Sequence, residues 1–272
     1  MTWAGSTRLR RTLVSLAVLA VLYGIASEIG SRVLPRRIWM GAHYIEDVEL
    51  LPPYASLAEE AVFLVRSGIL PASVLASGGR VLGGVILGAL AGIPLGLGMA
   101  WAARVEYVAE PWIAFFRFTP AFALLPLYVL WFGFGEGAKI LLIASGVAIV
   151  TLQGAFDGAR RVPRVYLDAA ASLGAGGGLV LRRLVVPAAV PSVLASLRIA
   201  VALAWVTMVV AELIKPTMPS LGYLLALAGA YPRVPTMLIG IVTIGALVLA
   251  SDVAAMGVYR RGTRWMRRQD GG

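Results

Sequence analysis

The chain has 272 residues, of which 59% are hydrophobic and only 14% are charged, and its mean hydropathy is +0.84. Soluble domains are about half apolar and about a quarter charged, so this composition excludes a large water-soluble domain. The net charge is +10, and with one histidine, His43, and no cysteine, the chain excludes disulfides, thiolate metal sites and multi-histidine clusters. The composition indicates a polytopic membrane protein.

Six stretches are long and apolar enough to be membrane-spanning helices. A helix needs roughly 20 mostly apolar residues to cross about 30 Å of hydrocarbon, and the Ala/Leu/Gly content here favours helices over strands. Charged residues follow the first stretch without a small-residue cleavage site, which predicts an uncleaved span rather than a signal peptide. The predicted spans are residues 12–30, 72–100, 109–131, 138–157, 189–212 and 235–257.

The basic residues indicate the orientation of these spans. Membrane proteins concentrate arginine and lysine in cytoplasmic segments. If the N-terminus is inside, the cytoplasmic segments hold twice as many basic residues as the outer ones, where we place Lys139 and Lys215. We therefore expect both termini in the cytoplasm. The positive charge is then a topology signal beside the lipid, and we expect no nucleic-acid partner.

Residues 31–70 form the longest predicted outer segment. Prolines divide its first part, and residues Tyr54 to Ser67 have a helical pattern. The segment is either a solvated cap or part of a docking surface for an external partner. His43 lies in it, and we interpret this histidine as a surface residue.

Local signals within two spans predict departures from uniform helices. Pro120 and Pro126 lie in one span, which predicts an interrupted helix whose freed carbonyls face a cavity or a neighbouring helix. Thr119 either caps this break or lines a path for cargo. In the second span, closely spaced glycines predict close helix packing rather than ligand binding. They are Gly83, Gly84, Gly88, Gly92, Gly96 and Gly98.

The loop of residues 158–188 is longer than a usual connection between helices. After a basic run, an alanine-rich helix is predicted at about residues 165–175. Pro163 and Asp168 favour its start, and Gly174 can adopt the left-handed conformation that ends a helix. Small alanines allow close insertion into a groove of a partner, whereas a helix lying on the membrane would have larger apolar residues on one face.

This loop resembles the EAA loop of ABC importer permeases, whose pattern is Glu-Ala-Ala, three residues, Gly, nine residues, Ile-x-Leu-Pro. Here Asp168-Ala169-Ala170 precedes Gly174, and Leu184-Val185-Val186-Pro187 follows, at the same two spacings. The three departures each keep the chemical class. The stretches 117–136 and 197–223 are similar to nitrate/sulfonate/taurine-type permeases, and the resemblance covers roughly residues 72–260.

The resemblance implies the type I ABC importer permease fold, an all-α membrane protein with six transmembrane helices and a cytoplasmic coupling helix. It implies a bacterial inner-membrane location, a second permease copy, cytoplasmic ABC ATPase subunits, and a periplasmic or lipid-anchored substrate-binding protein. The chain itself contains no Gly-x-x-x-x-Gly-Lys-Ser/Thr loop, so we expect ATP and magnesium on the partner ATPase and no cofactor or enzyme activity here. The residues implied to couple to the ATPase are Asp168, Ala169, Ala170, Gly174 and Pro187.

The sequence is accordingly divided into three parts. Residues 1–71 are predicted to form the N-terminal helix and the outer segment. Residues 72–260 are predicted to form the permease transmembrane domain with its coupling loop, and residues 261–272 a basic tail.

Ionisable groups inside a membrane are costly, so those in the predicted spans are candidates for the translocation path. Three arginines and no lysine in these positions favour a small anion as cargo. Arg80 and Arg117 can equally have structural roles, paired with Asp157 or with helix ends, and Arg198 is long enough to reach the inner interface. The path candidates are Arg198, Arg117, Arg80, Thr119 and Glu212.

Alternative functions are less compatible with the residues. Permeases of this type also serve vitamin precursors and aromatic acids, so a cargo of that kind is an open alternative. An ATP-independent secondary transporter predicts coupling carboxylates at mid-membrane, whereas the acids here lie mostly near span ends. An intramembrane enzyme would need a nucleophile and base, or metal ligands, at membrane depth.

Overall fold

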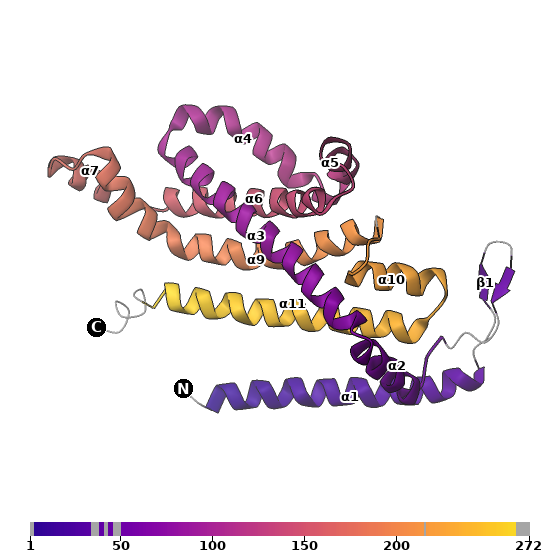
Figure 1. Ribbon diagram of the computed structural model, residues 1–272. Coiled ribbons are helices and arrows are strands. Elements are labelled where there is room, and N and C mark those ends of the chain that lie inside the picture. The colour runs from indigo at the N-terminus through magenta and orange to yellow at the C-terminus, as the bar shows by residue number, and fades with distance from the viewer. Residues whose placement is uncertain (1–2, 34–37, 41–42, 46–49, 215, 265–272) are drawn as a thin grey trace. The chain divides into compact units, whose positions relative to one another are not determined.

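The computed structural model describes residues 3–33, 38–40, 43–45, 50–214 and 216–264 (Figure 1). The described chain falls into two compact units. One consists of residues 1–71 with 224–242, and the other of residues 72–223 with 243–272. Each unit is described by itself.

The first unit contains a long helix and a small hairpin. Its elements are α1 (Trp3–Val33), β1 (Ile38–Met40), β2 (His43–Ile45) and α2 (Tyr54–Arg66). The two strands pair antiparallel, with Trp39 opposite Tyr44, a hairpin that the all-helical prediction missed. The helix expected from Tyr54 is confirmed. The Tyr23 hydroxyl donates to the carbonyl of Pro52 over 2.9 Å, which fixes the chain before α2 against α1.

The second unit is helical in its described residues. Its elements are α3 (Ile69–Trp101), α4 (Ala103–Phe118), the 3₁₀ turn η1 (Ala121–Leu124), α5 (Leu125–Phe132), α6 (Glu136–Arg160), α7 (Arg164–Ser172), α8 (Gly177–Val180), the π-helical η2 (Leu181–Val185), α9 (Val186–Ile214), α10 (Leu221–Ala230) and α11 (Val234–Gly262). The first residues of α3, most of α10 and the first part of α11 belong to the other unit.

Four of the described helices are long and apolar enough to cross a membrane. They are Ile69–Trp101, Glu136–Arg160, Gly177–Ile214 and Val234–Gly262, and they confirm the predicted spans 72–100, 138–157, 189–212 and 235–257. The predicted span 12–30 lies within α1, where the apolar stretch is Ala17–Gly30. The short apolar helix α10 was not predicted.

The interruption expected in the span 109–131 is confirmed, because α4 ends at Phe118 and α5 begins at Leu125. Thr119 is extended, with ψ of 121°, as the residue before a proline usually is. Its hydroxyl donates to the carbonyl of Phe115 over 2.9 Å. Thr119 therefore caps the broken helix, which is one of the two roles considered for it.

Glycines place α6 in direct backbone contact with α3. A Cβ on Gly92 would lie 2.3 Å from the carbonyl oxygen of Ala148, and one on Gly96 would lie 2.2 Å from that of Leu152. Gly84 and Gly88 face α6 in the same way. The prediction of close packing is confirmed for these four positions, whereas Gly83 makes ordinary contacts and Gly98 faces open space.

A neighbouring face of α6 packs equally closely on α9. A Cβ on Gly154 would lie 2.0 Å from Ser196 Oγ, and one on Gly158 would lie 2.9 Å from the carbonyl oxygen of Ala189. Figure 1 shows α9 running alongside α6. Buried Val81, Ile143 and Met208 from α3, α6 and α9 form the core between these helices. α6 is therefore the central helix of this unit.

We expect Gly92→Ala to reduce the yield of folded protein sharply, because its methyl group would collide with backbone rather than with a movable side chain. Overpacking of this kind costs about 1–3 kcal/mol. Gly98→Ala, on the same helix but facing open space, is the matched control. Thermal unfolding of the two purified variants in detergent measures the difference, and equal melting temperatures would contradict the proposed packing.

Candidate functional site

Helix α9 carries Arg198, Trp205 and Glu212 at intervals of seven residues, which is close to two helical turns. The three side chains therefore share one stripe of the helix. Trp205 Nε1 donates to Ser251 Oγ of α11 over 3.0 Å, and Arg198 also reaches α11. Glu212 instead reaches α3. The stripe thus divides into a buried part near the end of α9 and a more exposed part near its middle.

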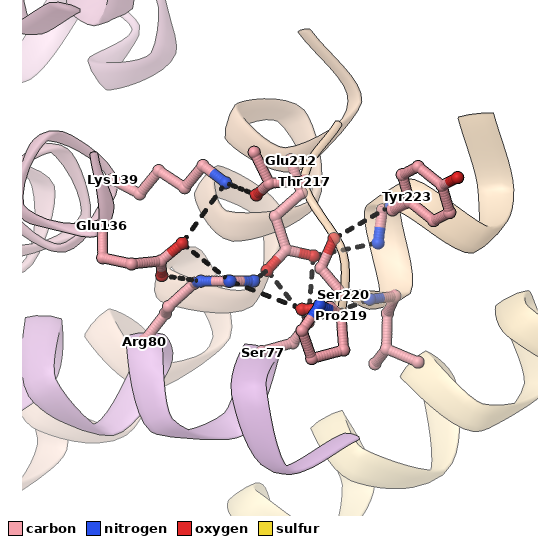
Figure 2. Close-up of polar contacts among 11 residues, drawn as sticks. Ser77, Arg80, Glu136, Lys139, Glu212, Thr217, Pro219, Ser220 and Tyr223 are labelled. Carbon is pink, nitrogen blue, oxygen red and sulfur yellow. Dashed lines mark hydrogen bonds and ion pairs between the residues drawn. The ribbon is translucent and has the colours of Figure 1, made fainter. Parts of the chain in front are cut away.

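The buried part is centred on the carboxylate of Glu212, which is 0% exposed (Figure 2). It accepts hydrogen bonds of 2.9 Å from Ser77 Oγ, 2.5 Å from Arg80 Nη1 and 2.9 Å from the backbone N–H of Gly222. Ser77 Oγ in turn accepts the N–H of Leu221 over 3.0 Å. These contacts join α3, α9 and the start of α10.

A second carboxylate, that of Glu136 at the start of α6, completes the charge balance. Arg80 Nη2 donates to Glu136 Oε1 over 2.9 Å, and Nε also contacts this carboxylate. Lys139 Nζ lies 3.8 Å from Glu136 Oε1 and hydrogen-bonds Thr217. Two cations and two carboxylates therefore meet in a neutral cluster, in which Glu136 alone is well exposed, at 55%. We call Ser77, Arg80, Glu136, Lys139 and Glu212 the buried ionic cluster.

This cluster corrects two expectations. Of the partners considered for Arg80, Asp157 is ruled out, because Arg80 pairs with Glu136 and Glu212 and Asp157 accepts a hydrogen bond of 2.9 Å from Gln153 Nε2. Lys139, placed on the outer surface from the sequence, is only 3% exposed. Both differences have one cause: Glu136, the last residue of the stretch 117–136, is a charge partner of Arg80 and of Lys139. The participation of Arg80 and Glu212 in a translocation path stays a prediction.

The exposed part of the stripe is the ion pair of Arg198 with Asp252. Arg198 Nε and Nη2 donate to the two oxygens of Asp252 over 2.5 and 2.8 Å. The side chains are 39% and 40% exposed and line a cavity of about 570 Å³ between α9 and α11. Asp252 was missed from the sequence, although an aspartate within a predicted span signals a partner for a buried arginine.

A neighbouring cavity of about 440 Å³ leads from this pair towards the ends of α6 and α9. Ala195, Ile199 and Tyr259 line both cavities. The second is also lined by Gln153, Asp157, Arg161 and Ser192, and Arg161 Nη1 donates to Ser192 Oγ over 3.3 Å. The fifth path candidate, Arg117, is in the last turns of α4, and its side chain lies outside the described residues.

Helix α7 confirms the short helix predicted in the loop. Gly174 has φ of +74°, and the N–H groups of Gly174 and Ala175 donate to the carbonyls of Ala171 and Ala170 over 2.9 and 3.0 Å. This is a Schellman end. The start was predicted less well, because Pro163 immediately precedes the helix and Asp168 lies past its first turn.

The two faces of α7 differ. Leu167 and Ala170 pack against a cluster containing the buried residues Ala159, Val180 and Val185. The other face exposes Asp168 and Ala169, together with large apolar side chains. These are Val165, Tyr166 and Leu173, which are 73%, 58% and 88% exposed, so the exposed face is not made of small alanines alone, as the sequence predicted. Figure 1 shows α7 projecting past the ends of α6 and α9, away from α5. The structure therefore presents an exposed helix face on an anchored support.

Comparisons with known proteins give consistent results. The model of a family described as binding-protein-dependent transport system inner membrane component matches residues 84–268. A probable ABC transporter permease protein of Brucella abortus is 35% identical over 243 residues, covering 88% of this chain and 97% of that protein. The taurine transport system permease protein of Escherichia coli is 32% identical over 260 residues, which covers 94% of this chain and 90% of that protein.

A third relative is the putative aliphatic sulfonates transport permease protein of Bacillus subtilis, 28% identical over 236 residues, which covers 86% of this chain and 85% of that protein. Among solved structures, the MetNI methionine ABC transporter in an inward-facing conformation has a TM-score of 0.64 at 18% identity. The match covers 72% of this chain and 96% of that one, and at this identity it shows the fold alone.

Proposed function

Since the chain belongs to the family of binding-protein-dependent transport system inner membrane components, it is an ABC transporter permease subunit, and we propose that it carries a small sulfonate-like anion inward. In this proposal a periplasmic binding protein delivers the anion, and a separate cytoplasmic ATPase drives its passage. Both termini then lie in the cytoplasm, so α7 and the basic tail are on the side of ATP.

The observation that carries the transducing role is the exposed face of α7. Its rear face is anchored by Leu167 and Ala170, so a force applied to the exposed face is transmitted to α6 and α9 rather than absorbed by a loose loop. Val165, Tyr166 and Leu173 supply apolar area for a groove of the ATPase, and the neighbouring arginines favour an acidic rim.

The proposal includes a second copy of the chain. One loop of this kind engages one ATPase subunit, and ATP-binding subunits act as pairs in the importers that the sequence resembles. Two copies related by twofold symmetry provide two α7 helices and are the simplest closed arrangement.

The names of the relatives support the cargo class. Permeases at 32% and 28% identity are named for taurine and for aliphatic sulfonates. Both compounds carry a sulfonate, two of whose oxygens can accept the paired N–H donors of a guanidinium. Arg198 presents such a group to a cavity in the described part of the chain.

We expect the cognate binding protein to bind taurine or an alkanesulfonate with a dissociation constant in the micromolar range, about −8 kcal/mol. Isothermal titration of that protein with taurine, ethanesulfonate, nitrate and a neutral pyrimidine vitamin precursor measures the preference. Selective binding of the neutral compound would contradict the anion, while leaving the permease role intact.

A further inference from the structure

The Arg198–Asp252 pair differs from the buried ionic cluster in its exposure. Arg80 and Glu212 are 6% and 0% exposed, whereas Arg198 and Asp252 are 39% and 40% exposed. A charge at mid-membrane is costly when it faces lipid, so an exposed pair at this depth lines either a water-filled space or a protein contact. Arg198 is about 18 Å along α9 from its first residue, which is near the middle of that helix.

The surroundings of the pair favour the water-filled space. The cavity of about 570 Å³ has Asp252 and Tyr259 on its α11 wall and Arg198 on its α9 wall. The second cavity shares Ala195, Ile199 and Tyr259 with the first and is lined further by Gln153 and Arg161, so polar groups occur from Arg198 towards the end that carries α7. Lipid-facing surfaces lack such a succession of polar side chains.

The guanidinium of Arg198 is only partly used. Nε and Nη2 donate to Asp252, whereas Nη1 makes no hydrogen bond within the described part of the chain. Arginine has five N–H donors in a planar fork that fits an oxoanion through two of them. A sulfonate can therefore contact Nη1 first, while Asp252 still neutralises the rest of the group.

We propose that Asp252 is an exchangeable counter-ion for Arg198, whose place is taken by the sulfonate group of the cargo during passage. This inference rests on the proposed anion cargo. Asp252 keeps the guanidinium neutralised when the site is empty, so no bare charge is left at mid-membrane. It also competes with the cargo, which keeps binding weak and allows release towards Arg161. Asp157 lines the second cavity, where its negative charge repels the anion and so shortens the time for which the anion is bound there.

The absence of cysteine from the sequence allows a direct test with single introduced thiols. Ala202 is exposed and lines the cavity beside Arg198. In proteoliposomes containing the full-length chain, we expect Ala202→Cys to react at similar rates with an anionic sulfonatoethyl thiosulfonate reagent and with its cationic trimethylammonium counterpart, each rate divided by that with a free thiol, because the neighbouring pair is neutral. Leu90→Cys on α3, 68% exposed and apolar, is expected to react with neither.

Variants of the pair separate its two members. Asp252→Asn in the Ala202→Cys background is expected to raise the anionic-to-cationic rate ratio by roughly threefold, because it leaves Arg198 unpaired. Arg198→Gln is expected to lower the ratio, because it leaves Asp252 unpaired. Ser251→Ala is the matched control, because it removes the hydrogen bond to Trp205 between the same two helices without altering the pair. Millimolar ethanesulfonate is expected to slow labelling, and to do so at lower concentration in the Asp252→Asn variant.

Two results would overturn the exchange. One is a cysteine at position 202 that reacts with neither reagent, which shows a site closed to water. The other is a rate ratio that Asp252→Asn and ethanesulfonate both leave unchanged. Neither result affects association with an ATPase, so failure of this inference and failure of the permease role are distinguishable. If Arg198→Gln fails to fold, the Asp252→Asn variant and the competition by ethanesulfonate still test the exchange.

Discussion

Replacing Gly174 by valine is expected to lower ATP-driven uptake at least about tenfold, while the helices of the membrane domain stay folded. Gly174 has φ of +74°, where a β-branched residue is strained by roughly 1–2 kcal/mol. Apart from its two chain neighbours, no described residue places a heavy atom within 4 Å of a Cβ at this position, so the loss comes from backbone strain at the end of α7 rather than from a clash. The strain reorients the face that carries Leu173.

The matched control is Gly174→Asn, because asparagine tolerates the left-handed conformation better than other side chains. We expect this variant to keep most of the uptake. Co-purification of the ATPase and thermal unfolding of the permease are measured on both variants. If valine and asparagine lower uptake equally, the conformation of Gly174 is not what couples the loop to the ATPase.

Arg80→Met is expected to give the largest loss of stability, about 3–5 kcal/mol, because it leaves the buried charge of Glu212 without its cation. Ser77 and the N–H of Gly222 still donate to this carboxylate, but neither carries charge. Thermal unfolding of the purified chain in detergent measures the loss. Methionine keeps most of the apolar stem of arginine without its charge, so the change tests charge more than the loss of apolar contacts.

Two further variants make this result interpretable. Glu136→Gln removes the exposed carboxylate of the same cluster and is expected to cost less than Arg80→Met, because Glu212 still balances Arg80 and only Lys139 loses its nearby carboxylate. The double variant Arg80→Met with Glu212→Gln removes both buried charges and is expected to recover about half of the loss. Equal destabilisation by Arg80→Met and Glu136→Gln would contradict the assignment of Glu212 as the principal partner.

Features encoded by short-range physics were predictable from the sequence. Apolar length marked the spans, Pro120 marked the break after α4, and Gly174 marked the end of α7, because each depends only on a few neighbouring residues. The glycines of α3 also signalled close packing. In these cases the residue itself limits the backbone, whatever it packs against.

Pairings between distant helices were not predictable in the same way. Arg80 is separated from Glu212 by 132 positions, and Arg198 from Asp252 by 54. The sequence identified the arginines as costly groups, but which carboxylate each meets depends on how the helices pack. Asp157 was a reasonable candidate for Arg80 by type and was wrong by position, since it lies at the other end of α6. The β1–β2 hairpin and the helix α10 were not predicted, because each is shorter than the stretch of about 20 apolar residues by which spans are identified.

The most direct test of the transducing role is uptake of radiolabelled taurine into proteoliposomes. One set of vesicles contains the permease alone. A second set contains the permease together with its cognate ATPase and its cognate binding protein. We predict accumulation only in the complete system and only with ATP on the side of α7. Full uptake by the permease alone, without ATP, would contradict the account.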